Sequence, residues 1–215
     1  MAQEQVANVA KLKKKQWHPI IAPKQFDNVV LGETLVYEPS AMLGKTLSHS
    51  LMNLTNDLKR QNINIHFEVI GVEDGKAITR IIGYEIVSSS VKRFIRRNSE
   101  KINLSFACET ADNVMLRVKP LIVTNAEVKG SVSTHLSNNV VQYLVKTIKK
   151  MTYDEFFNDL ILHKVQAMMR EHLNKIYPLK VCEIRYAGIG TSQKPNEARE
   201  KKEEAKAEIK EEQKI

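Results

Sequence analysis

The residues best placed to do chemistry form a cluster of five cations, which are Lys92, Arg93, Arg96, Arg97 and Lys101. Only one acidic residue, Glu100, lies among them. Helical spacing places the three arginines together on one face of a helix predicted over 88–98, opposite Val91 and Ile95. Because a guanidinium group can bind two phosphate oxygens at once, this face suits a nucleic-acid backbone. The alternative is an ordinary solvated helix face.

Two further basic groups extend the prediction. A helix expected over 137–151 ends in Lys146, Lys149 and Lys150, and cations there also stabilise the helix dipole without any ligand. The N-terminal segment has a lysine-rich run before the only tryptophan, formed by Lys11, Lys13, Lys14, Lys15 and Trp17. Such a run also fits a localisation signal or an anionic-membrane contact. We predict that both groups contact nucleic-acid phosphates and that Trp17 stacks on a base or wedges into a groove.

Patterns typical of catalysis or metal binding are weak. The segment 43–46 ends like a phosphate-binding loop, but Pro39 stands where that loop needs its first glycine. None of the six histidines has the i,i+4 spacing of a helical metal pair. Acidic residues at 154, 155 and 159 stand where a helix start favours them. The two cysteines lack CxxC spacing, so we expect reduced thiols and no metal. Because the catalytic patterns are weak as well, we expect no cofactor and no enzyme activity.

Strand patterns come first in the chain and helical patterns later. Alternating or β-branched segments predict strands over 26–36, 45–54, 63–72, 76–87, 102–109, 114–123 and 181–186. Asp74-Gly75 predicts a hairpin, and Pro120 predicts either an edge position or an end for its strand. Thr152 with Glu155 forms a capping box that begins one long helix reaching Tyr177. We therefore predict an α+β fold: a largely antiparallel, barrel-like β-sheet with about three packed helices.

Charge and composition divide the 215 residues into three parts. Residues 1–24 form a basic arm that Pro19 and Pro23 keep extended, and 25–190 form a single globular domain. The tail, 191–215, has balanced acidic and basic residues and few apolar ones, so we expect it to be flexible or transiently helical. The net charge of +8 therefore belongs to the rest of the chain. With no apolar run of membrane length and no secretory signal, we expect a cytoplasmic protein that does not enter membranes.

Four segments are similar, in order and spacing, to one protein family. They are KKKQWHPIIAPKQF (13–26), IHFEVIGVEDGKAITRIIGYEIVSSSVKRFIRR (65–97), MTYDEFFNDLILHKV (151–165) and KIYPLKVCEIRYAGI (175–189). The sequence resembles the eukaryotic-type S-one family of small-subunit ribosomal proteins, and its short C-terminal region resembles the archaeal members. Family members often carry a tryptophan in the basic helix after the hairpin, whereas Phe94 and Ile95 stand here.

The resemblance implies a structural role in translation. It implies a barrel-like α+β protein that binds small-subunit ribosomal RNA on the platform, near the messenger exit, in the cytoplasm. The neighbours it implies are a platform protein of the S-eleven family and the messenger RNA. A free-standing RNA-binding regulator is the alternative from the residues alone, and a nucleic-acid-processing enzyme lacks the clustered carboxylates it would need for metal ions.

Overall fold

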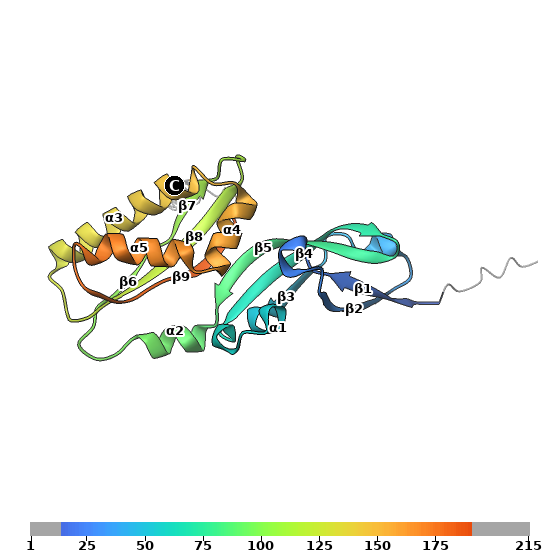
Figure 1. Cartoon of the computed structure of the whole chain (residues 1–215), viewed down its shortest axis with the longest axis horizontal. Helices are drawn as coiled ribbons and strands as arrows, with labels where there is room; N and C mark the ends of the chain where they lie inside the picture. The colour runs from blue at the N-terminus through green and yellow to red at the C-terminus, as the bar shows by residue number, and fades with distance from the viewer. Residues whose placement is uncertain (1–13, 191–215) are drawn as a thin grey trace, which may run out of the picture. The chain divides into compact units, whose positions relative to one another are not determined.

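The computed structural model describes residues 14–190 (Figure 1). The predicted binding residues Lys11 and Lys13 and the predicted tail lie outside these residues. The described chain groups into two compact units, one ending at Ile82 and the other beginning at Gly83. We describe each unit by itself, and the single domain over 25–190 stays a prediction. Among residues 14–190, no helix is both long and apolar enough to span a bilayer.

The first unit, which ends at Ile82, is a sheet with strand order β2-β1-β5-β4-β3. Its strands are β1 (Gln16–Ile21), β2 (Val30–Val36), β3 (Thr46–Ser50), β4 (Ile63–Glu73) and the first part of β5 (Lys76–Ile86). β1 pairs antiparallel with β2 and parallel with β5. Because no pairing joins β2 to β3 in the described chain, the sheet is open, and the expected barrel-like closure is not observed.

Short helical turns connect these strands. They are η1 (Lys24–Phe26), η2 (Pro39–Met42), α1 (Leu51–Thr55) and η3 (Leu58–Arg60). The strand predicted over 45–54 was too long, because a helical turn begins at Leu51 and buries Leu51 and Leu54 on one side. The predicted hairpin turn is confirmed: Asp74 and Gly75 both have positive φ, as a type I′ turn requires.

The segment predicted as a surface arm is extended but belongs to the sheet. β1 lies between β2 and β5, and the Thr79 hydroxyl donates a hydrogen bond of 2.8 Å to the Ile21 carbonyl. Proline lacks a backbone N–H, yet Pro19 is tolerated because β1 pairs with β5 only at Ile20 and Ile21. The sequence analysis missed that the β-branched run of β2 needs a partner strand, which β1 supplies.

The second unit, which begins at Gly83, packs helices on a sheet. Its elements are α2 (Ser88–Phe94), β6 (Lys101–Asn103), β7 (Phe106–Glu109), β8 (Met115–Thr124), α3 (Gly130–Ile148), α4 (Tyr153–Ile161), α5 (Lys164–Asn174) and β9 (Leu179–Ile189). α5 packs on β9, and α3 packs on α5 and β7 (Figure 1). Fully buried leucines of α3, at 136 and 144, contribute to this core.

β8 is a central strand, so the edge position predicted from Pro120 was wrong. β9 pairs with one side of β8, and β6 and β7 pair with the other. The register between β8 and β9 shifts at Lys119/Pro120: Lys119 pairs with Tyr186 and Pro120 with Ile184, which leaves Arg185 without a partner position. A β-bulge of this kind accommodates a proline inside a sheet, because the ladder is already interrupted there.

The predicted helices differ from the observed ones at their ends. The helix predicted over 88–98 stops at Phe94, because Ile95 takes an extended conformation. The helix predicted from Thr152 to Tyr177 is two helices, α4 and α5, separated by His163 with a φ of 60°. The capping box is confirmed, with the Thr152 hydroxyl and the Glu155 carboxylate each accepting from the other residue's backbone N–H. The described chain thus has five α-helices rather than about three.

Candidate nucleic-acid interface

The β-bulge on β9 gathers polar side chains on one side of the sheet of the second unit. Glu85, Tyr186 and Lys119 form a row across β5, β9 and β8, and paired residues share a side of the sheet. In the next row, Tyr84, Ala187 and Val118 point to the opposite side and are fully buried. Because Arg185 and Tyr186 together oppose Lys119, the bulge aims a second β9 side chain into the polar row.

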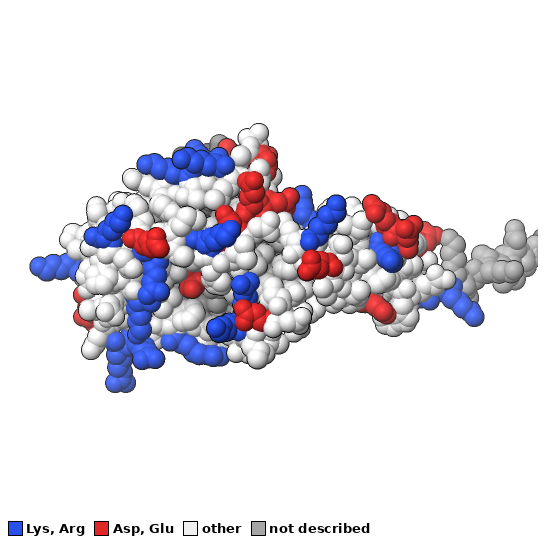
Figure 2. All heavy atoms as spheres, viewed as in Figure 1, with Lys and Arg blue, Asp and Glu red and all other residues white. Residues whose placement is uncertain are grey.

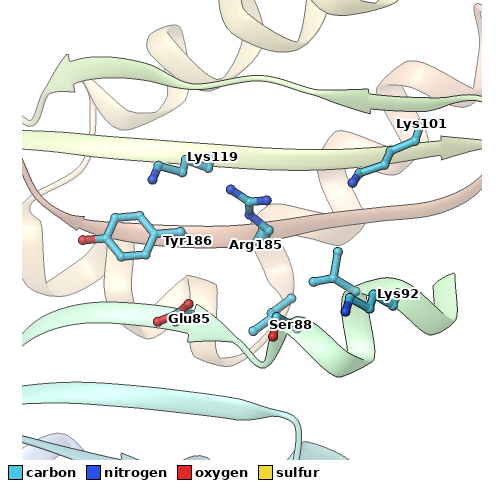
Figure 3. A pocket seen from close by; sticks show the side chains of 9 residues that line it. Glu85, Ser88, Lys92, Lys101, Lys119, Arg185 and Tyr186 are labelled. Atoms are coloured by element: carbon cyan, nitrogen blue, oxygen red, sulfur yellow. The ribbon is translucent and has the colours of Figure 1, made fainter. Parts of the chain in front are cut away.

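These side chains border a cavity of about 340 Å³, which we call the basic hollow. Its lining consists of Glu85, Ile86, Ser88, Val91, Lys92, Lys101, Lys119, Arg185 and Tyr186. In Figure 3, Lys101 of β6 and Lys119 of β8 lie on one side of the hollow, and Arg185 and Tyr186 of β9 lie in the middle. The residues of β5 and α2 lie on the opposite side. Four strands and one helix therefore line one cavity.

The basic hollow carries an excess of positive charge. Lys92, Lys101, Lys119 and Arg185 face a single carboxylate, Glu85, which cannot neutralise four cations. In Figure 2, Lys and Arg side chains gather on the part of this unit that holds α2 and β6. The Lys119 ammonium also lies 4.8 Å from the centroid of the Tyr186 ring, a cation–π contact that positions both groups. Such a concave cationic surface attracts an anion and holds it with several donors.

Two of the predicted binding residues, Lys92 and Lys101, line the basic hollow. Arg93, Arg96 and Arg97 do not line it, and they do not share the predicted helix face. The reason is the end of α2 at Phe94: Arg96 and Arg97 follow it in a turn in which the Ser99 hydroxyl accepts from the Arg96 N–H and donates to the Arg96 carbonyl. All three arginines are exposed.

Three lining residues were missed by the sequence analysis: Lys119, Arg185 and Tyr186. The alternation along β8, with Lys119 half-buried between the buried Val118 and Pro120, carries a signal that Lys119 lies on the polar side. Arg185 carries no such signal, because regular alternation would send it to the side opposite Tyr186. Its place depends on the bulge, which appears only in the pairing of β8 with β9, where Pro120 pairs with Ile184, 64 residues later in the chain.

The other predicted residues lie elsewhere. Lys146, Lys149 and Lys150 are exposed at the C-terminal end of α3, where the Lys149 N–H donates to the carbonyls of Thr147 and Val145. Lys14, Lys15 and Trp17 belong to the first unit, and Trp17 is 65% exposed. These groups are therefore separate surfaces rather than parts of the basic hollow.

Metal-ligating side chains do not form a cluster in residues 14–190. No group of three His, Cys, Asp or Glu side chains that could hold a metal ion occurs in this range. Burial raises the pKa of Cys108 to about 11 and that of Cys182 to about 12, so both thiols stay protonated at neutral pH. Burial also raises the pKa of Glu183 to about 7, against the opposing effect of Arg170. None of these groups lines the basic hollow.

Comparison with known proteins places the chain among ribosomal proteins. The model of the Ribosomal S3Ae family matches residues 3–189. The small ribosomal subunit protein eS1 of Staphylothermus marinus is 31% identical over 174 residues, which cover 81% of this chain and 82% of that protein. The proteins of the same name from Saccharolobus islandicus and Saccharolobus solfataricus are each 32% identical over 174 residues, covering 81% of this chain and 84% of theirs.

The family match spans both units and every residue that lines the basic hollow. It agrees with the resemblance read from the four sequence segments, including the likeness to archaeal members. The chain belongs to the Ribosomal S3Ae family.

Proposed function

We propose that the chain is a structural protein of the small ribosomal subunit and that its basic hollow binds phosphates of the ribosomal RNA. The observation that carries this proposal is the convergence of Lys92, Lys101, Lys119 and Arg185 on one cavity with a single carboxylate. The family membership and the names of the relatives support the ribosomal part of the proposal.

The hollow favours a polyphosphate backbone over a small anion. Its cations come from α2, β6, β8 and β9, so they span a surface rather than surround one point. Binding releases counterions from the RNA, and each neutralised phosphate adds to affinity and to its salt dependence. The Arg185 guanidinium adds a two-pronged contact, whereas each lysine acts as a point charge. We expect these contacts to position the RNA backbone without reading the edges of the bases.

We also propose where the protein lies in the small ribosomal subunit. Resemblance to the family supports a position on the platform near the messenger exit, beside a protein of the S-eleven family, with messenger RNA within reach. In this account the chain acts in the cytoplasm, has no catalytic activity and needs no cofactor. Cationic groups outside the hollow, at Arg93, Arg96, Arg97, Lys146, Lys149, Lys150 and the N-terminal Lys11, Lys13, Lys14 and Lys15, provide additional phosphate contacts.

A matched pair of variants tests the proposal. Lys101→Ala/Lys119→Ala removes two cations from the hollow, and Lys129→Ala/Lys175→Ala removes two exposed lysines of the same unit that do not line it. Affinity for small-subunit ribosomal RNA is measured from 50 to 200 mM salt. Losing two phosphate contacts reduces the steepness of the fall of log affinity with log salt by about two. The control variant keeps the wild-type slope.

Equal slopes for both variants would overturn the role of the hollow. Sedimentation with small subunits supplies the second readout: the hollow variant is expected to enter subunits less completely than the control. A wild-type protein that binds RNA but never sediments with subunits would instead support a free-standing regulator.

A further inference from the structure

The outer side of the β1/β2 ribbon in the first unit carries a contiguous set of exposed rings. Trp17 pairs directly with Leu35, so both project from the same side. Tyr37 follows Leu35 by two residues and lies one position beyond the end of β2. The exposed fractions are 65% for Trp17, 41% for Leu35 and 59% for Tyr37. Val36, between Leu35 and Tyr37, is buried, and His18, next to Trp17, is half-buried with its Nδ1 2.8 Å from the Gly75 carbonyl oxygen.

Cations flank these rings. The Lys15 ammonium lies 5.1 Å from the centroid of the Tyr37 ring, and Lys14 is exposed next to it. We call Lys15, Trp17, Leu35 and Tyr37 the aromatic platform. Isolated exposed apolar residues are common on proteins, but a contiguous group with a tryptophan and a tyrosine usually marks an interaction surface.

We propose that the aromatic platform binds unpaired bases of single-stranded RNA. Every base has a π face that stacks on an aromatic ring, and nearby cations contact the phosphates that join the bases. Trp17 pairs with Leu35, which stands two residues before Tyr37, so the two rings belong to the same end of the ribbon. One strand of RNA can therefore contact both rings while Lys15, whose ammonium lies against the Tyr37 ring, contacts its backbone.

The contact between Lys15 and the Tyr37 ring favours RNA over an apolar protein segment. It places a cation beside a ring, where a stacked base brings its phosphate, and Glu33 and Glu38 are the acidic residues of neighbouring positions. A protein partner would bury Leu35 and the rings against apolar side chains and gain little from the lysines. The inference rests on the proposed RNA-binding function, but it concerns the first unit and unpaired bases, whereas the basic hollow lies in the second unit.

Trp17 is the single tryptophan of the 215-residue sequence, which makes the test specific. Trp17 fluorescence is measured on adding an unstructured ten-nucleotide RNA, a fully paired hairpin of equal charge, and an abasic strand that keeps only the sugars and phosphates. Stacking quenches the emission with the unstructured RNA, and quenching by the hairpin and the abasic strand is much weaker. Equal quenching by the abasic strand would show phosphate contact alone and would overturn the proposal.

Variants measure the contribution of each ring. Trp17→Leu and Tyr37→Leu each lower affinity for the unstructured RNA by about five- to 150-fold, the range found for one stacked base. Trp17→Phe keeps most of the affinity, and Leu43→Ala, which alters an exposed apolar residue of the same unit, changes nothing. Thermal melts confirm that each variant folds. Wild-type RNA affinity of both ring variants, together with loss of a small-subunit protein neighbour, would show a protein-binding surface and overturn the proposal.

The proposals for the two surfaces can be contradicted independently of each other. If the platform is right, Lys101→Ala/Lys119→Ala still shows Trp17 quenching by the unstructured RNA. If only the basic hollow is right, that variant loses binding to structured RNA while no oligonucleotide changes the emission of Trp17.

Discussion

Glu183 shows how one half-buried side chain ties the stability of the second unit to pH. Its carboxylate oxygen Oε2 lies 3.7 Å from Nδ1 of His163, at the break between α4 and α5. Burial raises the pKa of Glu183 from 4.5 to about 7, while Arg170 acts in the opposite direction. The folded protein therefore binds this proton more tightly than the unfolded chain does, and Glu183 favours folding when it is protonated.

The pH dependence follows from that sign. The contribution of Glu183 to the free energy of unfolding is fully present below pH 4.5 and is lost as the pH rises through about 7. We predict that Glu183→Gln, which mimics the protonated form, raises the melting temperature relative to wild type more at pH 8 than at pH 5. Calorimetry at the two pH values measures both proteins. An equal difference at both would show that Glu183 has the same pKa in the folded and unfolded chain.

Residues differ in how well sequence alone could place them in the candidate site. Lys92 and Lys101 were predicted to bind because they lie in an obvious basic run. Arg96 and Arg97 belong to the same run, but their helix ends before them. Arg185 reaches the basic hollow through a register shift, and a register shift depends on which strands pair, not on the local sequence.

At the scale of single elements, α4 is the best understood from its sequence. Thr152 precedes it and Glu155 follows three residues later, and both reciprocal hydrogen bonds form, at 3.4 Å from the Glu155 N–H and 3.1 Å from the Thr152 N–H. The Tyr153 N–H donates to Asp112 over 2.8 Å, which ties the helix start to the turn before β8. The phenylalanines at 156 and 157 are then fully buried.

We predict that Thr152→Ala lowers the free energy of unfolding by about 0.5–2 kcal/mol, because it removes the acceptor for one N–H at the helix start. Thr152→Ser keeps the hydroxyl and serves as the control. Urea denaturation of both variants measures the effect. Equal loss in the serine and alanine variants would mean that the methyl group of Thr152, not its hydroxyl, stabilises α4.

Other elements could not be predicted from their local sequence alone, because they depend on contacts with distant parts of the chain. The hairpin of β4 and β5 could be predicted because a short turn sets its register. The helix break at His163 could not be predicted, because the helical spacing of apolar residues continues through it. His163 adopts the αL conformation at a small energetic cost, so tertiary packing determines whether the helix breaks there. β1 was taken for a free arm because its partner strand is set by tertiary pairing.

For the whole molecule, a net charge of +8 predicts an anionic partner without naming where it binds. The mixed α+β class and the largely antiparallel pairing followed from the order of strand and helix patterns. The open form of the sheet could not be predicted from that order, because closure into a barrel depends on whether the edge strands pair with each other. The basic hollow and the aromatic platform consist of different residues in different units, so each can be altered by substitutions that leave the residues of the other unchanged.

The central claim, that the basic hollow holds ribosomal RNA, is tested most directly by lysine reactivity in intact small subunits. Acetylation of each lysine is quantified by mass spectrometry in the free protein, in subunits, and in subunits digested with ribonuclease. The account predicts that Lys92, Lys101 and Lys119 are protected in subunits and become reactive again after digestion. Lysines of the hollow that react equally in the free protein and in the subunit, or that stay protected after the RNA is removed, would contradict it.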